Sequence, residues 1–335
     1  MKYTVGWICA IVTEFVAAQQ FLDDRYQTPG GLDSLDTNNY AVGRMGKHNV
    51  VIAVLPHGEY GISSATGVAK DMLRSFPNVK IGLMVGIGGG APLHEPGHKH
   101  DIRLGDVVVS SPRDGRGGVL HYRFGKDIEG KEFQITGFLN QPPPVLRTAL
   151  AGLEADHIQN GHDIRQSVVA LVRKNPRLQK FGRPDSGRDR LYGSEVLHPT
   201  ANDALNCENF CARDPTNLVS RQPRADNEDD PAIHYGLIAS ADTLMKNASE
   251  RDRYAREMNV LCFEMEAAGL MNQFPCLVIR GICDYADTHK NKEWQGYAAM
   301  TAAAYAADLL RKIPPEKVEA EKRIEDVLKS GFESR

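Results

Sequence analysis

The chain has 335 residues, of which 41% are hydrophobic and 25% are charged, as in a soluble protein with one large α/β domain or two smaller ones. Its formal net charge of -3 argues against nucleic acid as a partner, because proteins that bind nucleic acid usually carry a basic excess. No apolar run approaches the roughly 20 residues of a membrane span. Six dispersed cysteines are typical of a reducing compartment, so we expect a cytoplasmic protein with no membrane partner.

Short apolar runs alternate with amphipathic stretches along the chain. The predicted strands are Thr4–Ile11, Asn49–Leu55, Lys80–Val85, Asp106–Ser110, Ile233–Ile238, Val260–Phe263 and Cys276–Ile282. The predicted helices are Gly61–Phe76, Pro144–Asp156, Ala248–Met258, Met265–Gln273 and Glu293–Leu310. Several strands are apolar throughout, as expected when both faces of a mainly parallel or mixed sheet are buried. The pattern predicts a three-layer α/β/α fold with a central mixed β-sheet.

Two regions depart from this alternation. Residues from about 182 to 230 are rich in Arg, Asp, Asn and Pro and show weak periodicity, so we expect a long loop inserted into a domain of residues 1–313. After Ile313, residues 314–335 begin with a Pro-Pro step and continue as a charged amphipathic helix. We expect this segment to be a tail or a linker to a further domain.

Charged side chains follow two of the apolar strands at the end where α/β sheets bind ligands. Glu264 and Glu266 stand where one strand leads into a helix, and Arg280, Asp284 and Asp287 follow one another at the end of another strand. Carboxylates in such apolar surroundings are costly unless they are paired or used. Glu266 and Asp284 are therefore candidates for a functional site, while Glu264 and Asp287 fit helix caps or ion-pair partners equally well.

Five ordered segments of the chain resemble the purine nucleoside phosphorylase and methylthioadenosine nucleosidase superfamily. They are Gly6–Glu14, the glycine-rich Gly86–Pro92, Leu104–Ser110, Glu264–Ala267 (EMEA) and Arg280–Asp284, in which Cys283 replaces the usual Ser. The resemblance covers roughly residues 3 to 312. It implies the three-layer fold of that family and the cleavage of a purine N-glycosidic bond. The insertion resembles that of fungal-type nucleosidase domains fused to ankyrin, tetratricopeptide or NACHT-like modules.

The resemblance also implies a role for each matching residue. Asp284 would be the general acid that protonates N7 of the purine, because the purine anion is a poor leaving group. Glu14 would hold and deprotonate the attacking water, and Arg280 would orient that carboxylate. Glu266 would accept hydrogen bonds from the ribose hydroxyls, with Met265 packing on the sugar.

The base and its contacts are also implied by the resemblance. The segment from Ser240 to Met245 matches the stretch that lines the base in nucleosidases. We therefore expect Leu244, Met245 and the glycine-rich loop at Gly88 to contact the purine.

Water is favoured over phosphate as the nucleophile. Some phosphorylases of the family carry a G-D-P-x-R run after the first strand and an Arg before the glycine-rich loop, and this chain has neither. A carboxylate at Glu14 would repel phosphate but suits the activation of water. The backbone of Gly86–Gly90 is a candidate anion-binding nest, so a phosphate-dependent phosphorylase remains an alternative. A non-catalytic nucleotide sensor is a further alternative.

Basic residues in and near the insertion suggest a nucleotide substrate. Arg213, Arg221, Arg224 and Lys246 are candidates to bind a 5′-phosphate chain, since Arg pairs bidentately with phosphate oxygens. The substrate would then be a nucleotide such as ATP in place of adenosine. The alternative is that the insertion only elaborates the surface or packs on a second subunit.

The sequence predicts no cofactor and no metal site. His198, Cys207 and Cys211 offer three zinc ligands, but a CxxC knuckle and a clear fourth ligand are missing. The expected partners are a purine nucleoside or nucleotide and water. The family resemblance further implies a homodimer or a higher homo-oligomer.

Overall fold

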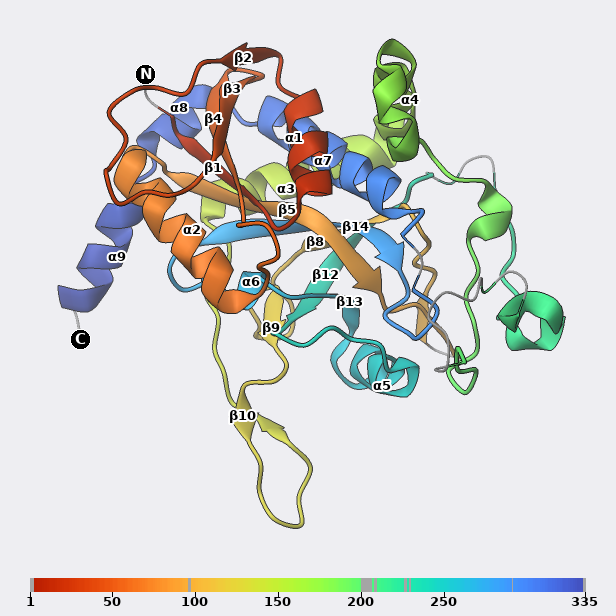
Figure 1. The fold of residues 1–335 in the computed structure, drawn as a ribbon. Helices are drawn as coiled ribbons and strands as arrows, with labels where there is room; N and C mark the ends of the chain where they lie inside the picture. Colours follow the sequence, from red (N-terminus) through yellow and green to blue (C-terminus); the bar gives the residue numbers. More distant parts are fainter. Residues whose placement is uncertain are drawn as a thin grey trace.

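The computed structural model describes residues 3–95, 98–199, 207, 210–225, 228, 230–290 and 292–333. A mixed β-sheet runs through the molecule and carries helices on both faces, which confirms the predicted three-layer α/β/α fold (Figure 1). In spatial order its strands are β13 (Val260–Glu264), β12 (Ile233–Ser240), β8 (Val107–Ser110), β14 (Cys276–Asp284), β5 (Ile81–Gly90), β1 (Val5–Cys9), β4 (His48–Val54), β3 (Tyr40–Met45) and β2 (Asp24–Tyr26), and β9 (Val119–His121) pairs with β12.

The sheet curls so that its first strand meets its fifth. β5 is parallel to β1 and β14, and its last residues also pair antiparallel with β13, joining Gly89 to Phe263 and Gly90 to Cys262. The strands from β13 to β5 therefore form a closed ring. This closure brings the ends of β5, β13 and β14 together, although β5 and β13 are far apart in the sequence.

Two groups of helices bury the two faces of the sheet. One face packs against α1 (Val12–Gln20), α3 (Pro144–Asn160), α4 (Ile164–Lys174) and α7 (Gln295–Lys312), and the other against α2 (Ile62–Ser75) and α6 (Ala267–Leu270). A third cluster of apolar side chains lies between α5 (Ala248–Met258) and β13. The Ala-rich α7 packs so closely on β14 that a Cβ at Gly281 would lie 1.8 Å from the Ala298 carbonyl oxygen. Only glycine fits there.

Shorter elements lie outside the sheet. They are the hairpin β6 (Leu93–Glu95) and β7 (His98–His100), the hairpin β10 (Gly125–Lys126) and β11 (Gln134–Ile135), and the 3₁₀ turns η1 (Pro176–Phe181), η2 (Ser186–Arg188), η3 (Cys211–Arg213) and η4 (Pro215–Asn217). The β10–β11 hairpin projects from the body of the molecule (Figure 1). In the described part of residues 182–230, regular structure is limited to the 3₁₀ turns η2, η3 and η4 and to an isolated bridge between Tyr192 and Leu218.

The C-terminal segment returns to the body of the domain. It forms α8 (Pro315–Ala320) and α9 (Ile324–Glu333). Val318 is fully buried in the same apolar cluster as α7, and the backbone N–H of Ile324 donates to the Val79 carbonyl at 3.0 Å. Among the described helices, none is long and apolar enough to cross a membrane.

Candidate active site

The site is built around Arg280, a fully buried arginine in β14. Its guanidinium is paired with the Glu264 carboxylate, lies 3.5 Å from Glu266 Oε2 through Nη2, and lies 3.9 Å from Glu14 Oε1 through Nη1. The structure therefore brings together Glu14, Glu266 and Arg280, which the sequence places far apart. It also adds Glu264 as the partner that binds the arginine most closely.

Glu14 is held in place by backbone donors at the start of α1. The N–H groups of Ala10 and Ile11 donate to its Oε2 at 2.6 and 3.1 Å, and the N–H of Ile87 donates to its Oε1 at 2.8 Å. Burial raises the pKa of Glu14, although Arg280 and these three N–H groups oppose the shift. A carboxylate that is fixed in this way and has a raised pKa is suited to accept a proton.

Gly86 makes room for this arrangement. A Cβ at this position would lie 2.2 Å from Glu14 Oε1 and 2.5 Å from Arg280 Nη1. The glycine in β5 is therefore required by the close approach of two charged side chains and not by an unusual backbone conformation.

Glu264 and Glu266 occupy the short connection between β13 and α6. Glu264 accepts from the N–H groups of Glu266 and Ala267, so it is both a cap for α6 and the ion-pair partner of Arg280. Glu266 accepts from the N–H of Gly61 at 3.3 Å. Burial raises the pKa of Glu266 to about 7; Arg280 lowers it, and the neighbouring Glu264 raises it further.

Asp284 is the last residue of β14. It is buried, its Oδ1 accepts from the Ala286 N–H at 2.8 Å, and its Oδ2 is 2.9 Å from Lys290 Nζ. A Cβ at Gly89 would lie 2.7 Å from Asp284 Oδ1, so the glycine-rich strand again permits close contact with a carboxylate. Lys290 is a site residue that the sequence did not single out as a partner of this acid.

A small pocket is lined by Glu264 and Lys290, the partners of Arg280 and Asp284. It is lined by Gly89, Thr243, Leu244, Met245, Phe263, Glu264, Met265, Ala286 and Lys290. Leu244 and Met245 thus lie where a base was predicted. The lining glycine is Gly89, however, whereas Gly88 lies one residue back, where an added Cβ would be 3.4 Å from the Arg280 side chain. The volume of about 20 Å³ suits about one water. A purine is larger than this volume, so wall residues such as Lys290 must move before it can bind.

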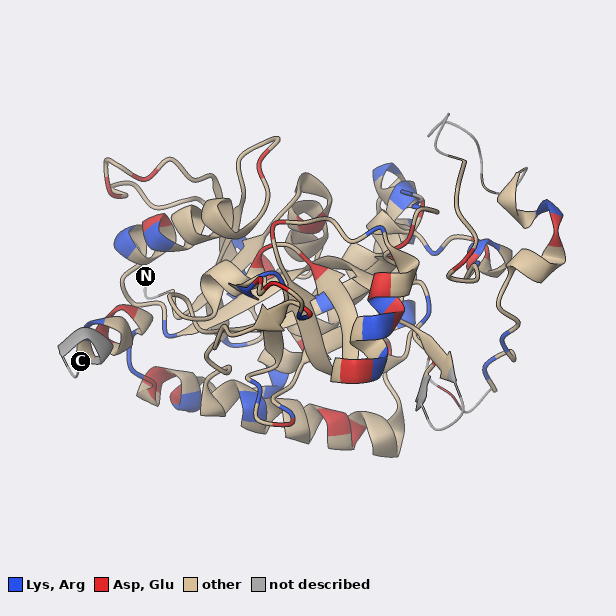
Figure 2. Ribbon diagram, turned by 90° about the horizontal axis from the view of Figure 1, so that it is seen from below, with Lys and Arg blue, Asp and Glu red and all other residues tan. Residues whose placement is uncertain are grey.

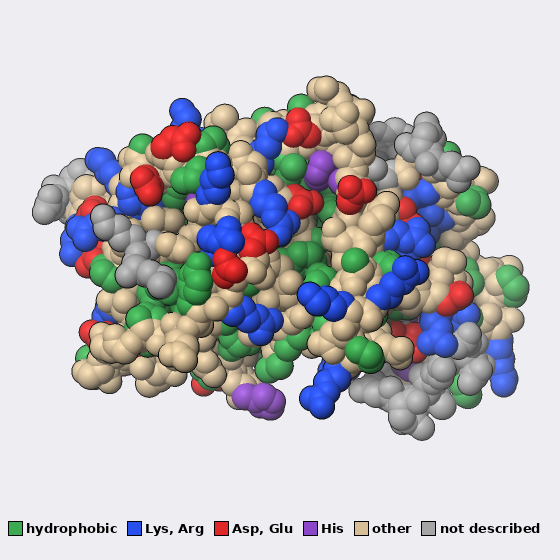
Figure 3. Space-filling view, turned by 90° about the horizontal axis from the view of Figure 1, so that it is seen from above, with side chains coloured by type: hydrophobic (Ala, Val, Ile, Leu, Met, Phe, Trp, Pro, Cys, Tyr) green, Lys and Arg blue, Asp and Glu red, His purple; other side chains and the backbone are tan. Residues whose placement is uncertain are grey.

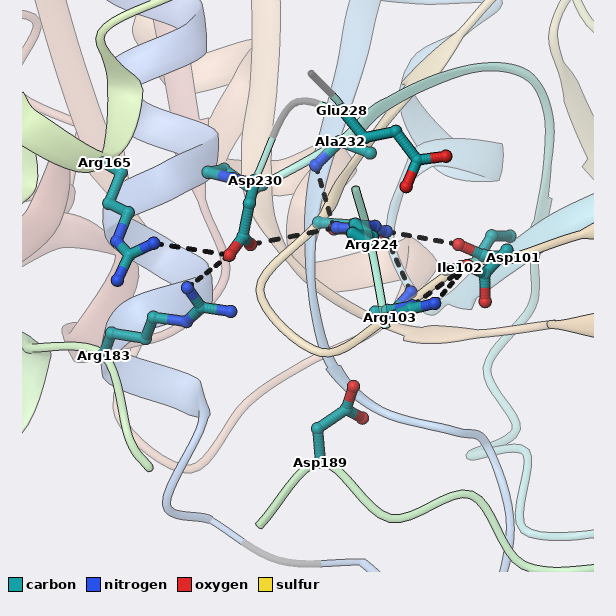
Figure 4. A network of polar contacts seen from close by, with 12 residues as sticks. Asp101, Ile102, Arg103, Arg165, Arg183, Asp189, Arg224, Glu228, Asp230 and Ala232 are labelled. Carbon is teal, nitrogen blue, oxygen red and sulfur yellow. Dashed lines mark hydrogen bonds and ion pairs between the residues drawn. The ribbon is translucent and has the colours of Figure 1, made fainter. Parts of the chain in front are cut away.

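The candidate phosphate-binding arginines have carboxylate partners. Arg221 is paired with Asp189 at 2.9 Å and donates to the Tyr285 hydroxyl. Arg224 is paired with Asp106, and lies 3.8 Å from Asp230 in a network of Arg and Asp residues from the insertion and from the rest of the domain (Figure 4). The insertion is thus joined to the sheet by ion pairs. A phosphate would have to replace these carboxylates.

The other two basic candidates are exposed. Lys246 directly follows the pocket residue Met245, and Arg213 lies over the ring of Phe210 at 5.6 Å. Lys and Arg alternate with Asp and Glu over the described surface, and neither sign covers a whole face in the two views (Figures 2 and 3). This distribution agrees with the small net charge.

Asp287 is a structural residue of the loop after Asp284. Its Oδ1 accepts from the His289 N–H at 2.8 Å, and its Oδ2 lies 3.8 Å from the buried Arg251. Burial raises the pKa of Asp287, but His289 and Arg251 outweigh it, so the pKa is lowered. This carboxylate therefore fits the ion-pair role that the sequence left open.

Comparison with known proteins agrees with this geometry. Residues 186–313 match the family model described as the phosphorylase superfamily. The matched region contains Glu264, Glu266, Arg280 and Asp284, whereas Glu14 comes from the part of the fold that precedes it.

Relatives in sequence include a much longer fungal protein. A nucleotide-binding leucine-rich repeat (NLR)-like protein of Hyaloscypha variabilis is 44% identical over 318 residues, which is 94% of this chain but 30% of that protein. The chain thus spans less than a third of the length of this relative. The 5′-methylthioadenosine/S-adenosylhomocysteine nucleosidase of Mycobacterium tuberculosis is 23% identical, with 94% of this chain and 98% of that protein covered.

Solved structures share the fold of this chain. The 5′-methylthioadenosine/S-adenosylhomocysteine nucleosidase from Neisseria meningitidis, in complex with methylthio-immucillin-A, has a TM-score of 0.56 at 15% identity and covers 92% of this chain and 99% of its own. Futalosine hydrolase of Helicobacter pylori has a TM-score of 0.53 at 15% identity and covers 94% and 99%. The fold therefore extends well beyond residues 186–313.

Proposed function

We propose that this chain is a purine nucleosidase, which hydrolyses the N-glycosidic bond of a purine nucleoside or nucleotide. The observation that carries the proposal is the buried group of Glu14, Glu266 and Arg280, with Asp284 at the end of the same strand as the arginine. Relatives named as a nucleosidase and a hydrolase share this fold. A set of this kind supplies an acid, a base and a ribose acceptor around one pocket.

In the proposed reaction, the bond between the ribose anomeric carbon and the purine nitrogen breaks. Asp284 donates a proton to the departing purine, and Glu14 takes a proton from the water that attacks the anomeric carbon. Glu266 accepts hydrogen bonds from the ribose hydroxyls. Arg280 Nε is buried and has no hydrogen-bond partner among the described atoms, which leaves a donor for a bound water. The products are the free base and ribose, or ribose phosphate from a nucleotide.

Lys290 controls access to the acid in this proposal. Its ammonium group is 2.9 Å from Asp284 Oδ2 and forms part of the pocket wall. Binding of the base displaces it. Once the ammonium group has moved, the Asp284 carboxyl is open to the bound purine.

The charge around Arg280 favours water over phosphate. One guanidinium faces the carboxylates of Glu14, Glu264 and Glu266, so the cluster carries no excess positive charge with which to hold an anion. Water, a neutral nucleophile, can bind beside these carboxylates, whereas a phosphate anion is repelled by them. The phosphorylase alternative predicts the opposite preference.

A panel of substrates tests the proposal. Adenosine, guanosine, inosine and ATP are incubated with the protein in phosphate-free buffer, and the free base is measured by chromatography. We expect release of base from at least one compound without phosphate. The absence of base release from every compound, with and without phosphate, would overturn the proposal and favour a nucleotide sensor.

A further inference from the structure

The insertion contains a cluster of metal-binding side chains that the proposed reaction does not use. His198, Cys207 and Cys211 place one imidazole nitrogen and two sulfur atoms within 4.8 Å of one another. His198 and Cys211 are buried, and Cys207 is half-buried. The sequence lacks a CxxC knuckle and a clear fourth ligand and so predicts no metal site, but the fold brings these three ligand atoms together.

The distances within the cluster match those around a tetrahedral ion. Nδ1 of His198 lies 3.3 Å from Sγ of Cys211 and 3.3 Å from Sγ of Cys207. A tetrahedral zinc ion with its usual Zn–N and Zn–S bond lengths holds nitrogen and sulfur ligands roughly 3.5 Å apart. A single ring nitrogen has one hydrogen or one lone pair and serves one thiol at a time, so a hydrogen bond accounts for one of the two contacts.

His289 supplies a second imidazole, and thus a fourth candidate ligand, beside this cluster. Its ring centroid lies 5.9 Å from that of His198, and its side chain is stacked on Tyr192 at 3.9 Å. Its side chain is 3% exposed, and neither ring nitrogen has a hydrogen-bond partner among the described atoms. Asp287 Oδ2, 3.8 Å from its Nδ1, lies where second-shell carboxylates orient a ligating histidine.

We propose that Cys207, Cys211, His198 and His289 bind one zinc ion, with the His289 ring shifting toward the other three ligands. Two thiolates and two imidazoles form a closed set of the kind found in structural zinc sites, and soft thiolates favour zinc over magnesium or calcium.

The position of the site gives the ion a structural role. The backbone N–H of His198 donates to Thr288 Oγ1 at 2.9 Å, and His289 directly precedes Lys290, the partner of Asp284. The ion therefore ties the insertion to the loop after β14 that forms a wall of the pocket. The zinc site itself does not depend on the proposed nucleosidase activity.

Metal content tests the proposal independently of activity. The full chain is produced in zinc-supplemented medium, purified under reducing conditions without chelator, and analysed by inductively coupled plasma mass spectrometry. We expect about one zinc per chain. The variants Cys207→Ser, Cys211→Ser and His198→Ala should bind zinc at least tenfold more weakly, and the buried Cys276→Ser, outside the cluster, should retain it.

Cobalt(II) provides a spectroscopic readout. Titration of the reduced, metal-free protein should give a thiolate-to-cobalt charge-transfer band together with the intense visible bands of a tetrahedral ion, both lost in Cys211→Ser. Visible bands that shift in His289→Ala, as water replaces an imidazole in the fourth position, support His289 as the fourth ligand, and an unchanged spectrum rejects that assignment. A wild-type chain without zinc and without the charge-transfer band, or one whose Cys207 and Cys211 form a disulfide under reducing conditions, would overturn the site.

Discussion

At the scale of single residues, the buried arginine explains why so many carboxylates can gather in one place. Arg280 has no contact with bulk solvent and is surrounded by Glu14, Glu264 and Glu266. Removal of one member would leave a buried charge without compensation, which is strongly destabilising. Substitutions that test chemistry are therefore made as amides that preserve shape, at Asp284 outside the cluster and at Glu266, whose change leaves Glu14 and Glu264 facing Arg280.

Replacement of Asp284 by Asn tests the assignment of the general acid. The amide keeps the acceptor for the Ala286 N–H but has no proton to give to the purine. We expect Asp284→Asn to lower kcat by at least about 100-fold while the affinity for substrate changes little. Steady-state kinetics and calorimetric binding measure the two effects. The exposed Asp127→Asn is the matched control, and wild-type turnover by Asp284→Asn would reject the assignment.

The pH dependence follows from Glu266. Its pKa is raised by burial to about 7, so the ionised form that accepts hydrogen bonds from ribose increases as the pH rises through that value. We expect kcat/KM to rise between about pH 6 and pH 8, and Glu266→Gln to lose this limb of the profile. If kcat/KM of Glu266→Gln still rises over this pH range, the ionising group is a residue other than Glu266.

The raised pKa of Glu266 also affects stability: activity is expected to increase with pH, whereas the free energy of unfolding should decrease. A carboxyl group whose pKa is higher in the folded than in the unfolded chain stabilises the fold at low pH, and this contribution is lost as the pH rises from about 4.5 to about 7. Denaturant unfolding of the wild type and of Glu266→Gln should therefore diverge over this range. The free energy of unfolding of the wild type should fall relative to that of the variant.

At the scale of elements, the closure of β13 onto β5 forms the site. The apolar strands were predictable because burial on both faces leaves a continuous hydrophobic run, and α5 was predicted with the bounds that it has. α1 was not predicted because its apolar residues continue directly from β1 without a break. α6 is a single turn, shorter than the predicted Met265–Gln273, because the chain turns after Leu270 toward β14.

The sequence proposed the residues of the candidate site but not their contacts. Glu14, Glu266, Arg280 and Asp284 were predicted from the family motifs, and only three-dimensional packing could show that Glu264 binds the arginine. Lys290 pairs with Asp284 because of the path of the loop after β14, which has no periodicity to predict it. The cysteines and histidines of the proposed zinc site likewise come together through the paths of loops that have no periodicity to predict them.

The loop after β14 provides a test at this scale. Lys290 is 25% exposed and Asp284 is 9% exposed, so their ion pair contributes about 1 kcal/mol or less. Because the base has to displace the ammonium group, Lys290→Ala should bind purine more tightly, by up to roughly fivefold. Calorimetric titration with adenine measures this, with the exposed Lys126→Ala in the β10–β11 hairpin as control. Weaker binding by Lys290→Ala would show that the lysine contacts the base instead.

At the scale of the whole molecule, the C-terminal helices are part of the domain that was expected to end at residue 313. Val318 is fully buried against the cluster that contains α7. Since two methyl groups are lost, Val318→Ala should lower the free energy of unfolding by about 1.5 kcal/mol, and the exposed Glu316→Ala on the same helix should leave it nearly unchanged. Denaturant unfolding measures both. Equal effects would mean that α8 does not stabilise the domain.

The central claim concerns the molecule as an enzyme that uses water. The protein is incubated with its best purine substrate from the panel in excess inorganic phosphate, and the sugar product is followed by ³¹P nuclear magnetic resonance. The buried carboxylates around Arg280 predict free base and a sugar that has gained no phosphate, at the same rate as without phosphate. Ribose 1-phosphate as the product, or base release only when phosphate is present, would contradict the account.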